Sequence, residues 1–157
     1  MPEQKLKSNP LIQLVDEVSR LQGRFKSLFA QLHADTGLKS MDDLVLNAIV
    51  EAEKPPTVPQ IGRSLGHPRQ VIQRAVNELL DLGLLEKSPN PDHKRAPLFT
   101  LTEEGRRLKM RSDTEALAIA NAFLQTVPDN QCTRLAEELQ GVRKAMQNFL
   151  SERPDNR

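Results

Sequence analysis

The sequence predicts a mainly α-helical protein with a single small β-hairpin, and three observations support this class. Apolar residues recur at three- and four-residue spacing over most of the chain, as they do along one face of an amphipathic helix. Only segments 84–87 and 98–101 have the form of short apolar strands, and turn-forming residues separate them. Directly before them, a short helix and a longer helix are expected to follow each other across a tight turn.

The shorter helix of this pair is predicted to begin at Thr57. Thr57 and Gln60 have the spacing of a capping box, in which each side chain satisfies a free backbone N–H group at a helix start. Gly66 is expected to end the helix, and Pro68 is expected at the first position of the next one, where its fixed φ is favourable. Two helices joined by so short a turn form a helix-turn-helix, and the hairpin after them makes it a winged helix-turn-helix.

The longer helix has two chemically different faces. Its apolar positions are predicted to be buried: Ile72, Ala75, Val76, Leu79 and Leu80. In the major groove, arginine can pair with guanine, and glutamine or asparagine with adenine. The polar arc is therefore predicted, together with Arg63 of the shorter helix, to bind DNA: Arg69, Gln70, Gln73, Arg74 and Asn77. The alternative is an ordinary solvated face, but the second helix of this motif is the one that enters the groove.

The hairpin is expected to form a wing with a basic tip. Gly83 should end the longer helix in a left-handed conformation. Lys94 and Arg95 are predicted to contact a phosphate or an adjacent minor groove, where the negative potential is strong. The alternative for this loop is that its charge serves solubility only.

Several short motifs follow one another in fixed order from Thr57: Leu65-Gly66, Val71-Ile72-Gln73-Arg74, Leu82 to Lys87, Asp92, Arg95 and Leu101-Thr102-Glu103-Glu104-Gly105. In this order and spacing they resemble the MarR family of bacterial transcriptional regulators. The resemblance implies a homodimeric DNA-binding repressor or activator, often released from DNA by a small ligand or by thiol oxidation. Two positions depart from the family pattern. The family usually has Ser or Thr at the position of Pro68, and Asp at the position of His93.

The charge is concentrated on the predicted DNA-binding segment. The 157 residues carry a net charge of only +1, with 22 Lys and Arg against 21 Asp and Glu. Residues 1–56 have 7 basic and 8 acidic side chains, residues 57–111 have 10 and 6, and residues 112–157 have 5 and 7. The net charges of the three segments are therefore −1, +4 and −2, and the basic excess lies where a nucleic-acid interface is expected.

Other classes of function find little support. His33, His67 and His93 lie in separate predicted elements, so no metal site is expected. No phosphate-binding glycine loop or catalytic pair is found, so we expect neither enzyme activity nor a cofactor. Cys132, the single cysteine, is expected to be buried and inert on an apolar stripe, with thiol sensing as the alternative. Without a signal segment or a membrane span, the protein is expected to be cytoplasmic.

Three segments are expected along the chain. Residues 1–36 would form an N-terminal dimerisation helix, 37–101 the winged helix-turn-helix lobe and 102–157 the C-terminal helices of the dimerisation region. Within the lobe, a supporting helix should begin with a capping arrangement at Ser40 and stop before Pro55. The small lobe cannot cover the apolar stripes at both ends of the chain, so a second copy should cover them. The predicted dimerisation residues are Leu14, Val18, Leu117, Phe123, Leu135, Leu139, Val142, Met146 and Phe149.

The family resemblance also implies a pocket for a small-molecule effector. It would lie where the first helices and the helix after Thr102 meet the lobe. The residues expected there are Phe25, Phe29, Leu32, His33 and Leu46. Their alternative role is ordinary core packing.

The sequence thus predicts a homodimeric, sequence-specific DNA-binding regulator, in the simplest case a repressor. Its operator would be a near-palindrome with half-sites about 10 bp apart. One alternative is a dimeric winged-helix adaptor that binds other proteins and has no specific affinity for DNA, which the modest net charge and Pro68 favour. Another is binding to duplex DNA without sequence preference.

Overall fold

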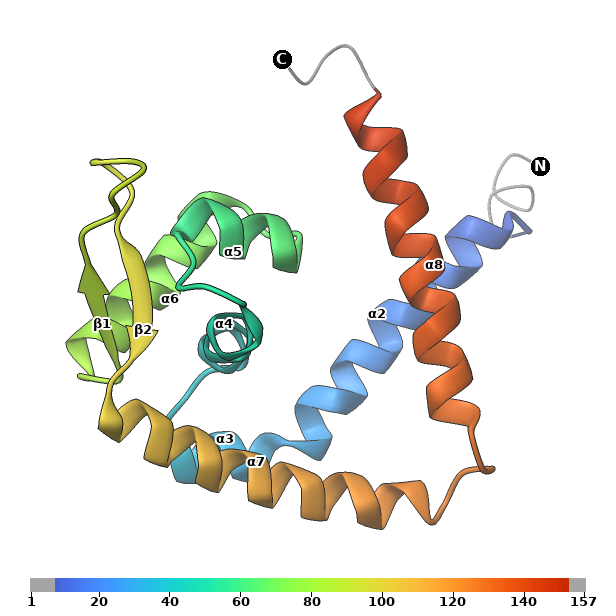
Figure 1. Cartoon of the computed structure of the whole chain (residues 1–157). Coiled ribbons are helices and arrows are strands. Elements are labelled where there is room, and N and C mark those ends of the chain that lie inside the picture. The colour runs from blue at the N-terminus through green and yellow to red at the C-terminus, as the bar shows by residue number, and fades with distance from the viewer. Residues whose placement is uncertain (1–7, 153–157) are drawn as a thin grey trace. The chain divides into compact units, whose positions relative to one another are not determined.

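The computed structural model describes residues 8–152 and is mainly helical (Figure 1). Its elements are α2 (Pro10–Leu28), α3 (Ala30–Thr36), α4 (Ser40–Glu51), α5 (Val58–Leu65), α6 (Arg69–Asp81), β1 (Leu85–Ser88), β2 (Leu98–Leu101), α7 (Glu103–Leu124) and α8 (Gln131–Ser151). The two strands form an antiparallel hairpin. The chain divides into two compact units after Leu117. These elements confirm the predicted fold class.

The core of the first unit lies among the helices α4, α5 and α6 and the hairpin. The three helices contact one another, β2 packs on α4, and β1 packs on α6 (Figure 1). Ile72, Val76 and Leu79 on α6 are fully buried, as predicted from their spacing, and Leu80 packs against the same core from a partly buried position. Burying an aliphatic side chain of this size contributes about 1.5–3 kcal/mol, so one face of α6 is firmly anchored.

The predicted capping of α5 is confirmed. The Gln60 side chain accepts a hydrogen bond from the Thr57 backbone N–H at 2.8 Å, and the Thr57 hydroxyl accepts one from the Gln60 N–H at 3.4 Å. Gly66 ends the helix with φ at +69°, a left-handed conformation that favours glycine. The turn after it is closed by a hydrogen bond of 3.0 Å from the His67 N–H to the Gly62 carbonyl.

Two predicted helix starts are displaced by one residue. Pro68 is the N-cap of α6 and not its first helical residue, because its ψ of 142° is extended. Its side chain makes no capping hydrogen bond, although its carbonyl accepts from the N–H groups of Val71 and Ile72. Similarly, the N-cap of α4 is Lys39 and not Ser40, since the Asp42 carboxylate accepts the Lys39 backbone N–H at 2.9 Å.

The end of α6 explains why β1 begins one residue later than predicted. The N–H of Leu84 donates to the Leu79 carbonyl at 2.9 Å, and the N–H of Gly83 donates to the Leu80 carbonyl at 3.0 Å. This pair of bonds is a Schellman motif, and it requires the positive φ of +70° that Gly83 adopts. Leu84 therefore closes the helix, and the ladder starts at Leu85, which pairs with Leu101.

The N-terminal segment is not the single helix that the sequence predicts. Helix α2 ends at Leu28, and α3 begins at Ala30, because Phe29 has φ −101° and ψ 12°. Two residues before this break, the Ser27 hydroxyl donates to the Gly23 carbonyl at 3.2 Å. Ser19 makes the same kind of bond to the Val15 carbonyl within an unbroken part of α2, so the bond of Ser27 alone does not explain the break.

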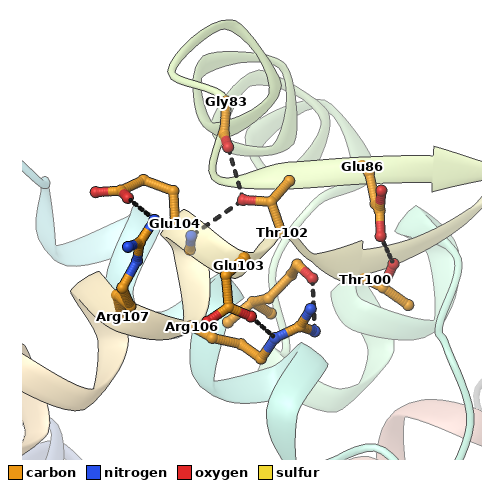
Figure 2. Close-up of polar contacts among 10 residues, drawn as sticks. Gly83, Glu86, Thr100, Thr102, Glu103, Glu104, Arg106 and Arg107 are labelled. Carbon is orange, nitrogen blue, oxygen red and sulfur yellow. Dashed lines mark hydrogen bonds and ion pairs between the residues drawn. The ribbon is translucent and has the colours of Figure 1, made fainter.

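The start of α7 is joined to the lobe by a polar junction, shown in Figure 2. The Thr102 hydroxyl donates to the Gly83 carbonyl at 2.7 Å and accepts the Gly105 N–H at 3.0 Å, so the predicted N-cap also ties α7 to the end of α6. Arg106 donates to the Leu101 carbonyl at 2.9 Å. Gly105 lies directly against the backbone of Leu84, since a Cβ built on it would be 2.1 Å from that carbonyl oxygen. Helix α7 therefore begins in close contact with the hairpin.

The terminal helices contribute little to the core of the chain. Neither α2 nor α8 contains a buried residue. The buried residues of α7 lie in its first half, and the apolar segment 116–124 is partly or fully exposed in the single chain. The prominent exposed apolar side chains of these helices are Leu11, Val15, Leu21, Phe25, Leu117, Phe123, Leu124, Leu135, Leu139, Met146, Phe149 and Leu150.

Replacing Gly105 by alanine should destabilise the protein. The new methyl group would overlap the Leu84 carbonyl, and such overpacking typically costs about 1–3 kcal/mol. Gly23→Ala is the matched control, because its Cβ would meet nothing within 4 Å and alanine is the better helix former by about 0.5–1 kcal/mol. Thermal unfolding at equal protein concentration measures both. An unchanged melting temperature for Gly105→Ala would contradict the close contact.

Candidate nucleic-acid interface

The exposed face of α6 presents the residues that the sequence predicts to read DNA. Arg69, Gln70, Arg74 and Asn77 are exposed and Gln73 is partly exposed, whereas the opposite face of the helix is in the core. Together with Glu78 and Asp81 these five residues line one shallow concavity. The predicted helix residues are therefore brought together on one surface. Arg63, on α5, is also exposed.

Two amides on this face are already arranged relative to each other. The Gln73 side-chain NH2 donates to the Asn77 carbonyl oxygen at 3.0 Å. After this bond, Gln73 retains its side-chain oxygen and one N–H, and Asn77 retains its own NH2 group. An amide with both a free oxygen and a free N–H can pair with the N6 and N7 edge of adenine. The hydrogen bond limits the rotamers of both side chains and leaves this chemistry available.

The side chain of Asn90 holds the wing loop in place, although its residue type alone indicates no more than a turn. Its amide NH2 donates to the Ala96 carbonyl at 2.9 Å, and its side-chain oxygen accepts the Asp92 N–H at 3.0 Å. The loop between β1 and β2 is thus closed across its base. His93, Lys94 and Arg95 lie at the exposed tip, as predicted.

The basic residues of segment 57–111 fall into two groups, those that form ion pairs in the described part of the chain and those that do not. On α7, Arg106 pairs with Glu103 and Arg107 with Glu104, at 3.4 and 2.9 Å, while Lys109 is buried and paired with Asp113. Within the described residues, the structure shows no ion pair for the cations predicted to bind DNA: Arg63, Arg69, Arg74, Lys94 and Arg95. Their charge therefore remains available to an external anion.

One charged contact on α6 could not be predicted from local sequence. The Lys39 ammonium lies 2.6 Å from the Glu78 carboxylate, although 38 residues separate the two positions. The hydrogen bond to Glu78 raises the pKa of Lys39 above its ordinary value, against the smaller opposing effects of desolvation and of the Arg74 charge. Lys39 therefore lies beside the predicted reading surface, since Glu78 lines the same concavity as Arg69 and Arg74. Only the tertiary packing of α4 on α6 creates this contact.

The predicted effector pocket residues have different environments. Leu32 and Leu46 are buried, and Leu46 belongs to the main core. Phe29 and His33 are partly buried, while Phe25 is about half exposed on α2. None of the five residues lines the concavity on α6. A second concavity is lined by other residues, among them Val50, Leu101, Met110 and Leu117. A role for these five residues in ligand binding therefore stays a prediction.

Two further sequence expectations concern Cys132 and metals. Cys132 is exposed in the single chain. It lies on the stripe of α8 that a second copy is expected to cover, so its burial stays a prediction. Within residues 8–152, no cluster of three or more His, Cys, Asp or Glu side chains is placed to hold a metal ion. In the same range, no helix has the length and apolar character needed to cross a bilayer.

Comparisons with known proteins connect this geometry to a family. The sequence model of the MarR family matches residues 36–96. The chain is 31% identical over 147 residues to the uncharacterised protein Rv2011c of Mycobacterium tuberculosis, in an alignment that covers 94% of this chain and 99% of the relative. The uncharacterised protein Mb2034c of Mycobacterium bovis gives the same identity and coverage.

Solved structures agree with this assignment. The PcaV transcriptional regulator of Streptomyces coelicolor, in complex with its natural ligand, is similar with a TM-score of 0.73 and 26% identity, covering 90% of this chain and 96% of that one. CouR of Rhodococcus jostii RHA1, bound to p-coumaroyl-CoA, shares the fold with a TM-score of 0.71 and 24% identity, covering 87% of this chain and 93% of its own. Both likenesses extend well beyond the winged lobe.

Substitution of Asn90 should loosen the wing in a way that separates its two hydrogen bonds. Asn90→Ala removes both, whereas Asn90→Asp keeps the oxygen that accepts the Asp92 N–H and removes the donor to Ala96. A bond worth about 1 kcal/mol predicts about fivefold faster amide exchange at Asp92 in the alanine variant and little change in the aspartate variant. NMR-detected hydrogen exchange measures this. Equal acceleration in both variants would show that the side-chain oxygen of Asn90 does not hold the loop.

Proposed function

Because the chain belongs to the MarR family of transcription regulators, we propose that it is a repressor that binds a near-palindromic operator as a homodimer. Helix α6 of each copy lies in a major groove, where Arg69, Gln70, Gln73 and Arg74 contact bases or nearby phosphates. Lys94 and Arg95 of each wing contact the flanking groove or its phosphates. Promoter blockage is the simplest output of such binding.

The observation that carries this proposal is the two-sided character of α6. Its apolar side is buried in the core, while its exposed side combines two cations with three amides. Such a face offers hydrogen-bond donors and acceptors that match base edges, and a helix is the element that fits the major groove. A surface made for solubility alone would not need the amides to be arranged by the Gln73–Asn77 hydrogen bond.

Homodimer formation is supported by the exposed apolar stripes. Leu135, Leu139 and Met146 are each more than a third exposed on α8, and Leu117 and Phe123 are similarly exposed on α7. Large apolar surfaces of this kind on a water-soluble lobe mark sites of association. Symmetric dimers are the commonest assembly that buries such a surface. Two copies related in this way present two recognition helices, which requires half-sites about one helical turn, roughly 10 bp, apart.

The proposal also includes regulation by a small-molecule effector. Relatives crystallised with a natural ligand or with p-coumaroyl-CoA show that this architecture accommodates small molecules in those proteins. We extend this to an effector that weakens operator binding here, with Phe25, Phe29, Leu32, His33 and Leu46 as pocket residues. A ligand can shift the equilibrium only if it binds the free and the DNA-bound conformations with different affinity.

Alanine substitutions at α6 and at the wing should have different effects. On an operator found by selection from random DNA, Arg74→Ala should cost about 1–3 kcal/mol and relax the preference for one base pair. Lys94→Ala should weaken binding to all sequences by similar factors and reduce the salt dependence. Fluorescence anisotropy on the selected and on shuffled duplexes, at several salt concentrations, measures both. Equal, sequence-independent losses would mean that α6 does not read bases.

A charge in the apolar stripe of α8 should dissociate the dimer. Leu139→Glu would bury an unpaired carboxylate twice, once in each copy, at a cost of several kcal/mol. We expect the dissociation constant of the dimer to rise by at least about 100-fold. Leu82→Glu is the matched control, since Leu82 is 59% exposed at the end of α6 and outside the stripe. Size-exclusion chromatography with light scattering measures the molar mass of both variants. A Leu139→Glu variant that remains dimeric would show that the apolar stripe of α8 is not the dimer interface.

A further inference from the structure

We propose that Lys39 belongs to the DNA-binding surface, where its ammonium bridges Glu78 of α6 and a backbone phosphate of the duplex. This inference rests on the proposed function and adds a contact from outside the helix-turn-helix and the wing. Lys39 would be a positioning contact, one that sets the depth and register of α6 without reading sequence. Three structural observations support it.

The first observation is that the backbone of Lys39 is fixed. Lys39 is the N-cap of α4, and its N–H donates to the Asp42 carboxylate at 2.9 Å. Asp42 itself is only 3% exposed, and the Lys39 carbonyl accepts the Asp43 N–H at 3.2 Å. Since α4 packs directly on α6, the base of the Lys39 side chain is held at a constant distance from the recognition helix.

The second observation concerns the unused donors of the ammonium group. The Lys39 Nζ atom lies 2.6 Å from Glu78 Oε2, and this is the bond that directs the side chain along α6. A lysine ammonium has three N–H donors and no acceptor. The Lys39 side chain is 69% exposed, so the two remaining donors are open to solvent beside Glu78, which lines the concavity on α6. A phosphate oxygen can take one of them while the bond to Glu78 persists.

The third observation is the charge balance of the concavity on α6. Arg69 and Arg74 line this concavity together with Glu78 and Asp81, so its formal net charge is zero although neither arginine forms an ion pair within residues 8–152. A DNA phosphate approaching the end of the helix would therefore meet carboxylates, unless another cation were present. Lys39 supplies that cation, because its ammonium contacts Glu78, which lines the concavity together with Arg74. An exposed ion pair contributes little to folding, so replacing Lys39 should leave the fold intact and allow its effect on DNA binding to be measured.

Salt-dependent binding to the selected operator and to a shuffled duplex tests the proposal. Lys39→Gln removes one phosphate contact from each copy, so the slope of log K against log salt should decrease in magnitude by about 1.8 on both duplexes. The affinity loss should accordingly be about tenfold larger at 50 mM than at 200 mM salt. Lys39→Arg should restore most of the affinity and the slope. Lys144→Gln, the same change on α8, controls for net charge and should leave the slope unchanged.

The double variant Lys39→Gln/Glu78→Gln separates a phosphate contact from mere neutralisation of Glu78. If Lys39 contacts phosphate, the reduced slope persists in the double variant. Recovery of the wild-type affinity and slope would show that Lys39 only screens Glu78 and would overturn the proposal, as would an unchanged slope for Lys39→Gln. Wild-type protein that binds no duplex would refute the proposed function as well, whereas normal wild-type binding with an unchanged slope refutes only the role of Lys39.

Discussion

Burial of one face of α6 is the constraint on which the rest of the structure depends. Ile72, Val76 and Leu79 are enclosed by α4, α5 and the hairpin, and this packing determines which residues of the helix face outwards. Because side chains on a helix are separated by about 100° per residue, burying this stripe necessarily exposes the arc that contains Gln70, Arg74 and their neighbours. Folding energy and the placement of the recognition surface therefore come from the same contacts.

Close backbone contacts extend this constraint to the wing and to α7. Leu84 ends the helix through its N–H and accepts the Thr102 N–H at its carbonyl, while Gly105 packs against the same peptide group. The hydroxyl of Thr102 adds a bond to Gly83. The end of α6, the hairpin and the first turn of α7 are consequently connected through a few buried or partly buried groups. The start of α7 is therefore positioned by the same peptide groups that end α6 and begin the hairpin.

The distribution of charge refines the simple picture of a basic segment. Residues 57–111 have a net charge of +4, and residues 103–111 at the start of α7 contribute two of these four charges. On α7, Arg106, Arg107 and Lys109 are paired with neighbouring carboxylates. The cations on α5, α6 and the wing are left for phosphates, and a modest net charge is then no obstacle to DNA binding. The proposed phosphate contact of Lys39 would extend this surface from an element outside the helix-turn-helix and the wing.

By itself, the sequence determined the mainly helical class, the helix-turn-helix, the capping of α5 by Thr57 and Gln60, the buried face of α6 and the exposed wing tip. These features depend on the local spacing of residues and on glycines such as Gly66 and Gly83. Both glycines adopt a positive φ that is favourable for glycine whatever residues surround it. The break at Phe29 and the hydrogen bonds of Asn90 are local in the chain, but residue spacing alone did not predict them. Tertiary structure alone decided the contact of Gly105 with Leu84 and the pairing of Lys39 with Glu78. Each of these depends on atoms brought together by folding, and residues far apart in the chain carry no local signal of a shared hydrogen bond.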